Sequence, residues 1–273
     1  MRIHFIAVGG AVMHNLAIAL QGKGYSVTGS DDEIFEPSRS RLASYGLLPE
    51  KFGWFPDKIT TGLDAVILGM HARADNPELL KAQELGIKIM SFPEFIYDQT
   101  RNKKRIVVAG SHGKTTTTAM IMHVFRTLGV KFDFMVGSLI DGYDTMVGLS
   151  DDSEIAVLEG DEYLTSALDT RPKFHLYMPD IAIINGIAWD HINVFPTFED
   201  YVGQFRIFAS KIPEGGTLIY FSGDRETKKI ADNLAGNIRK IPYSMHGYFQ
   251  NKKGFFAATH NRTVPLRIFG GHN

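Results

Sequence analysis

A glycine-rich loop that ends in a lysine and a threonine is the part of the chain best suited to chemistry. Residues 110–118 read Gly-Ser-His-Gly-Lys-Thr-Thr-Thr-Thr and follow the apolar run Ile106–Ala109. In a strand–loop–helix unit, backbone N–H groups and the helix dipole face nucleoside triphosphate phosphates, the lysine offsets their charge, and the threonine hydroxyl reaches magnesium. The sequence therefore predicts a nucleotide site in this loop, formed by Gly110, Ser111, His112, Gly113, Lys114, Thr115 and Thr116.

The spacing of this loop differs from the common P-loop, because Val108 stands where the first glycine of G-x-x-x-x-G-K-T would be. The alternative interpretation is a glycine-rich turn that caps an ordinary helix. That alternative explains Gly113, but it explains neither Lys114 nor the run of threonines, which are mediocre helix formers. We expect the following helix over residues 119–128.

Two polar positions after later strands could complete a metal site. The apolar run Ile155–Leu158 ends at Glu159, and Ile181–Asn185 is followed by His191. A carboxylate at a strand end beside a P-loop is suited to hold the magnesium of the nucleotide, although acidic turns after strands are common. His191 is either a metal or phosphate ligand or a plain loop histidine.

The beginning of the chain has the pattern of a second ligand-binding unit. Strand-like runs cover residues 3–8 and 25–30, with Gly9-Gly10 after the first and Asp31 after the second. An acidic residue about 20 positions after a glycine turn can reach a ribose hydroxyl. Alternatively, the two glycines only allow a helix and a strand to pack closely.

This pattern continues as a small parallel sheet with helices on both faces. Residues 65–69 and 87–90 are predicted strands, and between them we expect a helix over Pro77–Leu85, capped by Asn76. His71 lies in the loop at the carboxyl edge, where a ligand would bind. It either contacts that ligand or caps its own loop.

The chain thus divides into an N-terminal Rossmann-like domain (1–98), a linker (99–104) and a P-loop NTPase-like α/β central domain (105–273). We interpret the basic run 103–105 as part of a solvated linker. A helix capped by Thr197 is expected over 197–210.

Strands are also expected over residues 216–221 and 238–241, and a hairpin turn at Asn261-Arg262. The chain stops at Gly270–Asn273, directly after a predicted strand. A chain that ends where a helix would normally start suggests truncation.

Composition excludes several classes of function. With 273 residues, 44% of them hydrophobic, the chain can bury two ordinary cores, and its net charge of −1 gives no reason to expect a nucleic-acid partner. Without a membrane-length apolar stretch or a signal-peptide pattern, a cytoplasmic protein with no membrane partner is expected. The lack of cysteine excludes disulfides, thiolate metal sites and a cysteine nucleophile.

Short motifs occur in a fixed order along essentially the whole chain. They are Gly9-Gly10, Gly29-Ser30-Asp31, Asn76-Pro77-Glu78, Gly110–Thr116, Glu159, Asp190-His191 and Gly271-His272-Asn273. This set resembles the Mur ligase family of peptidoglycan synthesis, whose members use ATP to form amide bonds to UDP-muramyl precursors. The His-Gly-Lys-Thr form of the loop is similar to the branch that uses UDP-N-acetylmuramate itself.

The resemblance implies roles for particular residues. Gly9, Gly10, Asp31 and His71 would bind the UDP-sugar in the first domain, and the second domain would bind ATP and Mg²⁺. The lactyl carboxylate would attack the γ-phosphate to give an acyl phosphate, from which an amine displaces phosphate.

By the same resemblance, Lys114 would stabilise the transferring phosphoryl group, and Thr115 and Glu159 would hold Mg²⁺. His191 would help hold a second metal and the acyl phosphate. His272 and Asn273 match the segment on the adenine side of the nucleotide.

Segments 159–163, 169–174 and 190–196 resemble the branch that reattaches the L-Ala-γ-D-Glu-meso-diaminopimelate tripeptide in peptidoglycan recycling. Addition of L-alanine in peptidoglycan synthesis is the alternative. Gln204 occupies the place of the modified lysine of some sister ligases, so no carbamylated lysine is predicted. The family has a third, amine-binding domain that this sequence lacks, so we expect the 273 residues to bind UDP-N-acetylmuramate but to ligate little.

Two other classes of function compete with the ligase hypothesis. A non-catalytic UDP-sugar-binding module would bind the sugar nucleotide and ignore ATP. A dehydrogenase is suggested by the first βαβ unit alone, although the P-loop argues against it. The sequence does not fix the oligomeric state.

Overall fold

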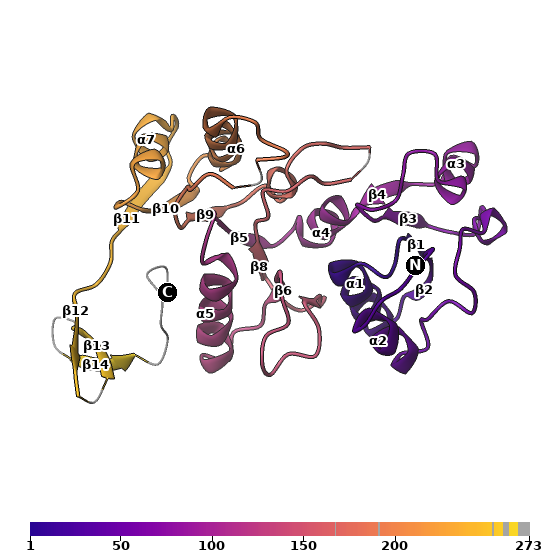
Figure 1. Cartoon of the computed structure of the whole chain (residues 1–273), viewed down its shortest axis with the longest axis horizontal. Coiled ribbons are helices and arrows are strands. Elements are labelled where there is room, and N and C mark those ends of the chain that lie inside the picture. The colour runs from indigo at the N-terminus through magenta and orange to yellow at the C-terminus, as the bar shows by residue number, and fades with distance from the viewer. Residues whose placement is uncertain (167, 191, 253, 259–261, 267–273) are drawn as a thin grey trace.

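The computed structural model describes the chain except for residues 167, 191, 253, 259–261 and 267–273. Two sheets, each covered by helices, follow one another along the chain, and a small third sheet follows them (Figure 1). This arrangement confirms the predicted α/β class with a parallel first sheet and a mostly parallel central sheet.

The first sheet is fully parallel, with the strand order β2-β1-β3-β4. Its strands are β1 (Arg2–Ile6), β2 (Ser26–Ser30), β3 (Ala65–Leu68) and β4 (Ile89–Ser91). Its helices are α1 (Ala11–Gly22), α2 (Ser38–Ser44), α3 (Pro77–Glu84) and α4 (Phe92–Thr100), with a 3-10 turn over Pro56–Lys58. Asn76 caps α3 as predicted, because its side chain accepts from the N–H groups of Glu78 and Leu79.

The central sheet has the strand order β11-β10-β9-β5-β8-β6-β7, and only β7 is antiparallel to its neighbour. Its strands are β5 (Lys104–Ala109), β6 (Asp133–Met135), β7 (Val147–Gly148), β8 (Ile155–Glu159), β9 (Ile181–Ile184), β10 (Thr217–Phe221) and β11 (Arg239–Tyr243). Its helices are α5 (Lys114–Thr127), α6 (Phe198–Ser210) and α7 (Arg225–Asn233), with a 3-10 turn over Lys173–Leu176. Figure 1 shows α5 on one face of this sheet and α6 and α7 on the other.

The small sheet is antiparallel and consists of β12 (Tyr248–Asn251), β13 (Gly254–Ala258) and β14 (Thr263–Leu266). Ala258 pairs with Thr263, so the predicted hairpin between β13 and β14 is confirmed. Asn261, which we placed in its turn, lies outside the described residues.

The solvated-linker interpretation of residues 103–105 is wrong for Lys103 and Arg105, although Lys104 is exposed. Lys103 Nζ lies 2.6 Å from Asp133 Oδ2 and also donates to Ser153 Oγ, while Arg105 is buried and donates to the carbonyl of Thr100. These side chains therefore pair with a buried carboxylate and with backbone carbonyls rather than with solvent. The helix α4 also extends to Thr100, past residue 98, so the domain boundary stays a prediction.

The two sheets are joined by side chains of α1 and α2. Asn15 Oδ1 accepts the backbone N–H of Met146 at 3.1 Å, and Arg41 donates both to Asn15 and to the carbonyl of Asp144. Lys23 pairs with Asp151 at 2.7 Å. Because α1 begins beside Gly9-Gly10, the glycine turn of the first sheet is connected to the β7 edge of the central sheet.

Within the described part of the chain, every helix is too short or too polar to cross a lipid bilayer.

Candidate nucleotide and sugar-nucleotide sites

The predicted loop forms the connection between β5 and α5. Gly110 adopts φ +134°, and a Cβ there would lie 3.0 Å from the backbone nitrogen of Asn185. Gly113 caps α5 in the left-handed conformation with φ 72°. Both positions therefore favour glycine, at Gly110 for lack of space and at both for backbone conformation. The helix starts at Lys114, earlier than the expected residue 119, and Thr118 donates to the Lys114 carbonyl within it.

A hollow of about 390 Å³ lies at the N-terminus of α5. Unpaired backbone N–H groups and the positive end of the helix dipole make such a position suitable for an anion. The hollow is lined by Ser111, His112, Gly113, Lys114, Thr115, Thr116 and Glu159. The fold thus brings the predicted loop residues and the predicted metal ligand together, with Gly110 at the base of the loop.

Thr115 and Glu159 form the oxygen-rich side of this hollow. The Thr115 hydroxyl donates to Glu159 Oε1 at 2.9 Å, and the Gly137 N–H donates to Glu159 Oε2 at 2.8 Å. Burial raises the pKa of Glu159, and the two hydrogen bonds partly oppose that rise. A hydroxyl and a carboxylate are hard oxygen donors of the kind that Mg²⁺ prefers, so these residues fit the predicted metal.

Lys114 has partners on the protein itself. Its ammonium lies 2.8 Å from the Gly110 carbonyl oxygen and 2.9 Å from Glu162 Oε2. The carboxylate of Glu162 is fully buried and also accepts from the hydroxyl of Tyr201 at 3.0 Å. Neither Glu162 nor Tyr201 was predicted from the sequence as a site residue. The available signal was the second acidic residue after β8, three positions beyond Glu159.

The segment after β9 contacts the glycine-rich loop between β5 and α5. Ser111 Oγ donates to the carbonyl of Ala188 at 2.7 Å and accepts the Ala188 N–H at 2.9 Å. His191, predicted as a metal or acyl-phosphate ligand, lies outside the described residues, as do His272 and Asn273. Their roles remain predictions.

The predicted sugar-nucleotide residues meet at the carboxyl edge of the first sheet. Ile6 at the end of β1 pairs with Ser30 on β2 and with Leu68 on β3, so the segments that follow leave the sheet at one edge. Gly9 and Gly10 follow β1, Asp31 follows β2, and the exposed His71 follows β3. This shared edge is the position where open parallel sheets bind ligands.

The carboxylate of Asp31, predicted to bind the ribose, is hydrogen-bonded within the protein. Asp31 Oδ2 accepts the Gly9 N–H at 2.7 Å, and a Cβ on Gly9 would lie 2.9 Å from the same oxygen. Burial raises the pKa of Asp31 to about 6; the Gly9 N–H opposes the rise and Asp32 adds to it. Asp31 therefore fixes the glycine turn, and its ribose contact stays a prediction.

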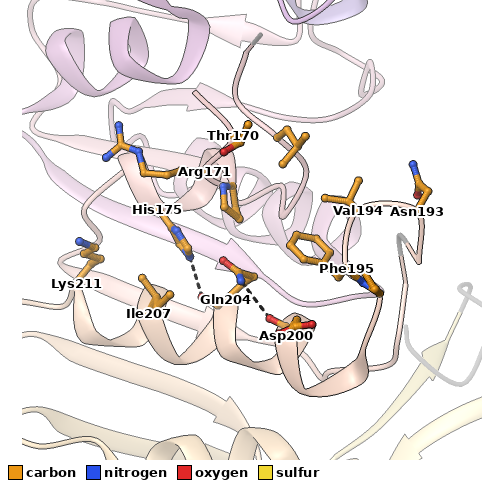
Figure 2. Close-up of a pocket in the computed structure, with 13 residues that line it drawn as sticks. Thr170, Arg171, His175, Asn193, Val194, Phe195, Asp200, Gln204, Ile207 and Lys211 are labelled. Atoms are coloured by element: carbon orange, nitrogen blue, oxygen red, sulfur yellow. Dashed lines mark hydrogen bonds between the residues drawn. The ribbon is translucent and has the colours of Figure 1, made fainter. Parts of the chain in front are cut away.

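A second hollow, with the larger volume of about 700 Å³, lies beside α6 (Figure 2). Lys211 and Arg171 lie towards one end, and Asn193 and Phe195 lie at the other. Gln204 lines its middle and donates to the Asp200 carbonyl within α6.

Two basic side chains of this hollow differ in their charge. His175 bonds through Nε2 to the Gln204 carbonyl at 2.8 Å, and burial lowers its pKa, so the ring is neutral. The guanidinium of Arg171 is paired with Asp169 at 2.6 Å.

The fold and the loop define a doubly wound α/β protein with a P-loop-type strand–loop–helix unit. Residues 2–104 match the model described as "Mur ligase family, catalytic domain", and residues 108–269 match the Mur ligase middle domain. The chain belongs to the Mur ligase family.

Curated relatives fall into two groups. The UDP-N-acetylmuramate–L-alanine ligase of Streptomyces avermitilis is 31% identical over 89% of this chain and 50% of its own length. The UDP-N-acetylmuramate–L-alanyl-γ-D-glutamyl-meso-2,6-diaminoheptandioate ligase of Escherichia coli K12 is 30% identical over 84% of this chain and 50% of its length. The chain spans about half the length of the curated relatives it matches.

A solved structure agrees on the fold. The L-alanyl-γ-D-glutamyl-meso-diaminopimelate ligase of Neisseria meningitidis superposes with a TM-score of 0.85 at 24% identity, over 99% of this chain and 89% of that one.

Proposed function

We propose that this chain is the UDP-sugar-binding and ATP-binding part of an amide ligase that joins UDP-N-acetylmuramate to the L-Ala-γ-D-Glu-meso-diaminopimelate tripeptide in peptidoglycan recycling. The observation that supports this most is the meeting of Lys114, Thr115 and Glu159 at one hollow on the N-terminus of α5. The first domain would supply UDP-sugar binding through the edge formed by Gly9, Gly10, Asp31 and His71.

The reaction has two steps. A carboxylate oxygen of the muramate attacks the γ-phosphorus of ATP and ADP leaves, giving an acyl phosphate. The amine nitrogen of the acceptor then attacks the acyl carbon, inorganic phosphate leaves, and the nitrogen loses a proton. Activation is needed because a carboxylate is a poor acyl donor.

The residues on the hollow stabilise charge in the first step. Loop N–H groups and Lys114 contact the phosphoryl oxygens, where negative charge is spread in the transition state. Thr115 and Glu159 would hold Mg²⁺, which would neutralise phosphate charge when bound. The proposed contributions of His191, His272 and Asn273 follow from the family resemblance alone.

The hollow beside α6 supports a peptide as the acceptor. From Asp200 to Lys211 the helix rises about 16 Å, and an extended tripeptide spans about 10 Å. Lys211 at one end would pair with a peptide carboxylate, whereas a single alanine would leave most of the hollow empty. The alternative acceptor, L-alanine, is supported by the first group of relatives.

Calorimetry on the 273-residue chain tests the proposal in stages. We expect binding of UDP-N-acetylmuramate and of Mg·ATP, followed by tripeptide binding that Lys211→Gln weakens without changing the ATP affinity. Absence of Mg·ATP binding after saturation with the sugar nucleotide would contradict the ligase function. Tripeptide binding that is indifferent to Lys211 would remove the support for a peptide acceptor. Ligation of either acceptor by this chain alone would show that no third domain is required.

A non-catalytic UDP-sugar-binding module remains the alternative of another class. It predicts that Lys114→Ala changes neither sugar-nucleotide binding nor the response to ATP. The ligase proposal predicts that the same variant keeps its affinity for the sugar nucleotide and binds Mg·ATP measurably more weakly.

A further inference from the structure

A fully buried carboxylate faces the lysine of the phosphate loop. Glu162 has no exposed surface, and its two oxygens lie 2.9 and 3.2 Å from Lys114 Nζ, whose side chain is 16% exposed. Burying a carboxylate is costly unless it is paired and hydrogen-bonded. This negative charge also lies close to the proposed triphosphate site, where it would repel the phosphates. A buried carboxylate at this position therefore needs a structural explanation.

The geometry around Lys114 gives that reason. A lysine ammonium has three N–H donors. The ammonium of Lys114 donates to the Gly110 carbonyl oxygen and to both oxygens of the Glu162 carboxylate, so two groups of the protein fix its position. A free lysine side chain loses rotamer entropy when it is held in one place. A lysine that is held before the nucleotide arrives has already lost most of that freedom.

Glu162 is itself held in place from the other side. The hydroxyl of Tyr201, a fully buried residue of α6, donates to Glu162 Oε1 at 3.0 Å and lies 2.9 Å from Ser111 Oγ. Burial, and secondarily the charge of Glu162, raises the pKa of Tyr201, so it stays a neutral donor. The network therefore connects the loop, the acidic segment after β8, and α6.

We propose that Glu162 is a positioning residue that fixes the Lys114 ammonium at the phosphate hollow before nucleotide binds, with Tyr201 holding Glu162 in turn. This inference rests on the proposed ATP-binding function of the loop. It assigns Glu162 a role through Lys114 and no contact with the nucleotide.

A double-mutant cycle on Mg·ATP affinity, measured by calorimetry, tests the role. Glu162→Gln keeps an oxygen for Tyr201 but places an amide nitrogen towards Lys114, so we expect about tenfold weaker Mg·ATP binding. In a Lys114→Met background the same change should have no further effect. AMP, which lacks the phosphates that Lys114 would contact, should bind equally well to wild type and Glu162→Gln.

Equal losses in both lysine backgrounds, or tighter ATP binding by Glu162→Gln, would overturn the positioning role. If wild type itself does not bind Mg·ATP, the proposed function fails first, so the two failures are distinguishable. Asp161→Asn is the matched control: it breaks the 2.6 Å pair with Lys173 on the same segment and should leave ATP affinity within about twofold.

A second variant covers the case in which Glu162→Gln does not fold, as judged by its thermal unfolding. Tyr201→Phe removes only the hydroxyl that holds Glu162, and it should weaken Mg·ATP binding about threefold. In the Lys114→Met background, Tyr201→Phe should again cause no further change in Mg·ATP affinity. A Tyr201→Phe loss that persists without Lys114 would also overturn the proposal.

Discussion

The hydroxyl of Thr115 and the carboxylate of Glu159 are hydrogen-bonded at 2.9 Å, although 44 residues separate them in the chain. The contact follows from strand register, because Val108 on β5 pairs with Glu159 on the neighbouring parallel strand β8. The loop after β5 therefore turns back over the end of β8. Substitution of Glu159 therefore tests the prediction that Thr115 and Glu159 bind Mg²⁺ together.

Glu159→Gln should weaken Mg·ATP binding by at least about tenfold, because one hard, charged oxygen ligand is lost. Binding of ATP in the presence of a chelator should change much less. Titration of both nucleotide forms measures the difference. Glu154→Gln, just before the same strand, is the control. Equal weakening with and without Mg²⁺ would exclude Glu159 as a metal ligand.

Gly110→Ala should damage the phosphate loop. The added Cβ would lie 3.0 Å from the Asn185 nitrogen and 3.1 Å from the Gly186 oxygen, on a backbone with φ +134°. We expect a loss of about 1–3 kcal/mol in unfolding free energy and a loss of ATP binding. Urea unfolding and calorimetry measure the two effects.

Gly203→Ala is the matched control for that substitution. It adds the same methyl group within α6, where nothing lies within 4 Å of it. Alanine should stabilise this helix by about 0.5–1 kcal/mol. If both variants behave alike, the close approach of the loop to the Asn185–Gly186 segment has no energetic consequence.

Asp31→Asn should stabilise the protein at neutral pH. The pKa of Asp31 in the folded protein is about 6, whereas an unfolded aspartate titrates near 3.9. Between these values the folded state binds more protons, so wild-type stability falls as pH rises through that window. The variant should gain about 1–3 kcal/mol at pH 7 and almost nothing at pH 4.

Denaturant unfolding of wild type, Asp31→Asn and the exposed control Asp57→Asn at both pH values measures this effect. A gain of the same size at pH 4 and pH 7 would show that titration of Asp31 is not its cause. The same Asp31→Asn variant should bind UDP-N-acetylmuramate more weakly if this carboxylate contacts the ribose.

Glu78→Ala should destabilise the first domain. The Glu78 carboxylate is fully buried, lies 3.2 Å from His4 Nε2 and accepts the Phe55 N–H at 2.7 Å. Its removal leaves these partners unsatisfied, at a cost of about 2–4 kcal/mol. Glu78→Gln, which keeps an acceptor, should lose less.

The pH dependence of the Glu78 contribution has the opposite sign to that of Asp31. Burial opposes ionisation of Glu78, but hydrogen bonds from His4 and Phe55 outweigh it and lower the pKa. The stabilisation is present above the ordinary glutamate pKa and is lost as pH falls through the lowered value. A loss in Glu78→Ala that is unchanged at acid pH would contradict this account.

Local patterns in the sequence were sufficient for much of the fold. Apolar runs predicted most of the parallel strands, although not β6. Side-chain caps predicted α3 at Asn76 and α6 at Thr197, whose hydroxyl accepts the Asp200 N–H. Three helices, α2, α4 and α7, were missed. The N-terminus of α4 nevertheless has a capping box, in which Ser91 and Glu94 bond each other's backbone.

The error at Lys103 and Arg105 has a definite cause. A run of basic residues usually indicates a solvated segment. The neighbouring sequence does not show that a carboxylate distant in the chain will pair with one of them. Asp133 and Asp180, the acidic partners of these two residues, lie 30 and 75 positions away in the chain. Such pairs become visible only when strand order is known.

The sequence by itself determined the backbone shape and the charge of the loop over residues 110–116, because glycine, lysine and threonine at fixed local spacing specify both. It also predicted a glycine turn after the first strand and an acidic residue after the second, whereas the hydrogen bond between Gly9 and Asp31 came from the structure. Only the tertiary structure placed Glu162 beside Lys114 and Tyr201 beside Glu162, and only the tertiary structure showed that Asn15 joins the two sheets. Those contacts depend on which strands are neighbours and which face of a helix is buried, and a linear pattern does not contain that information.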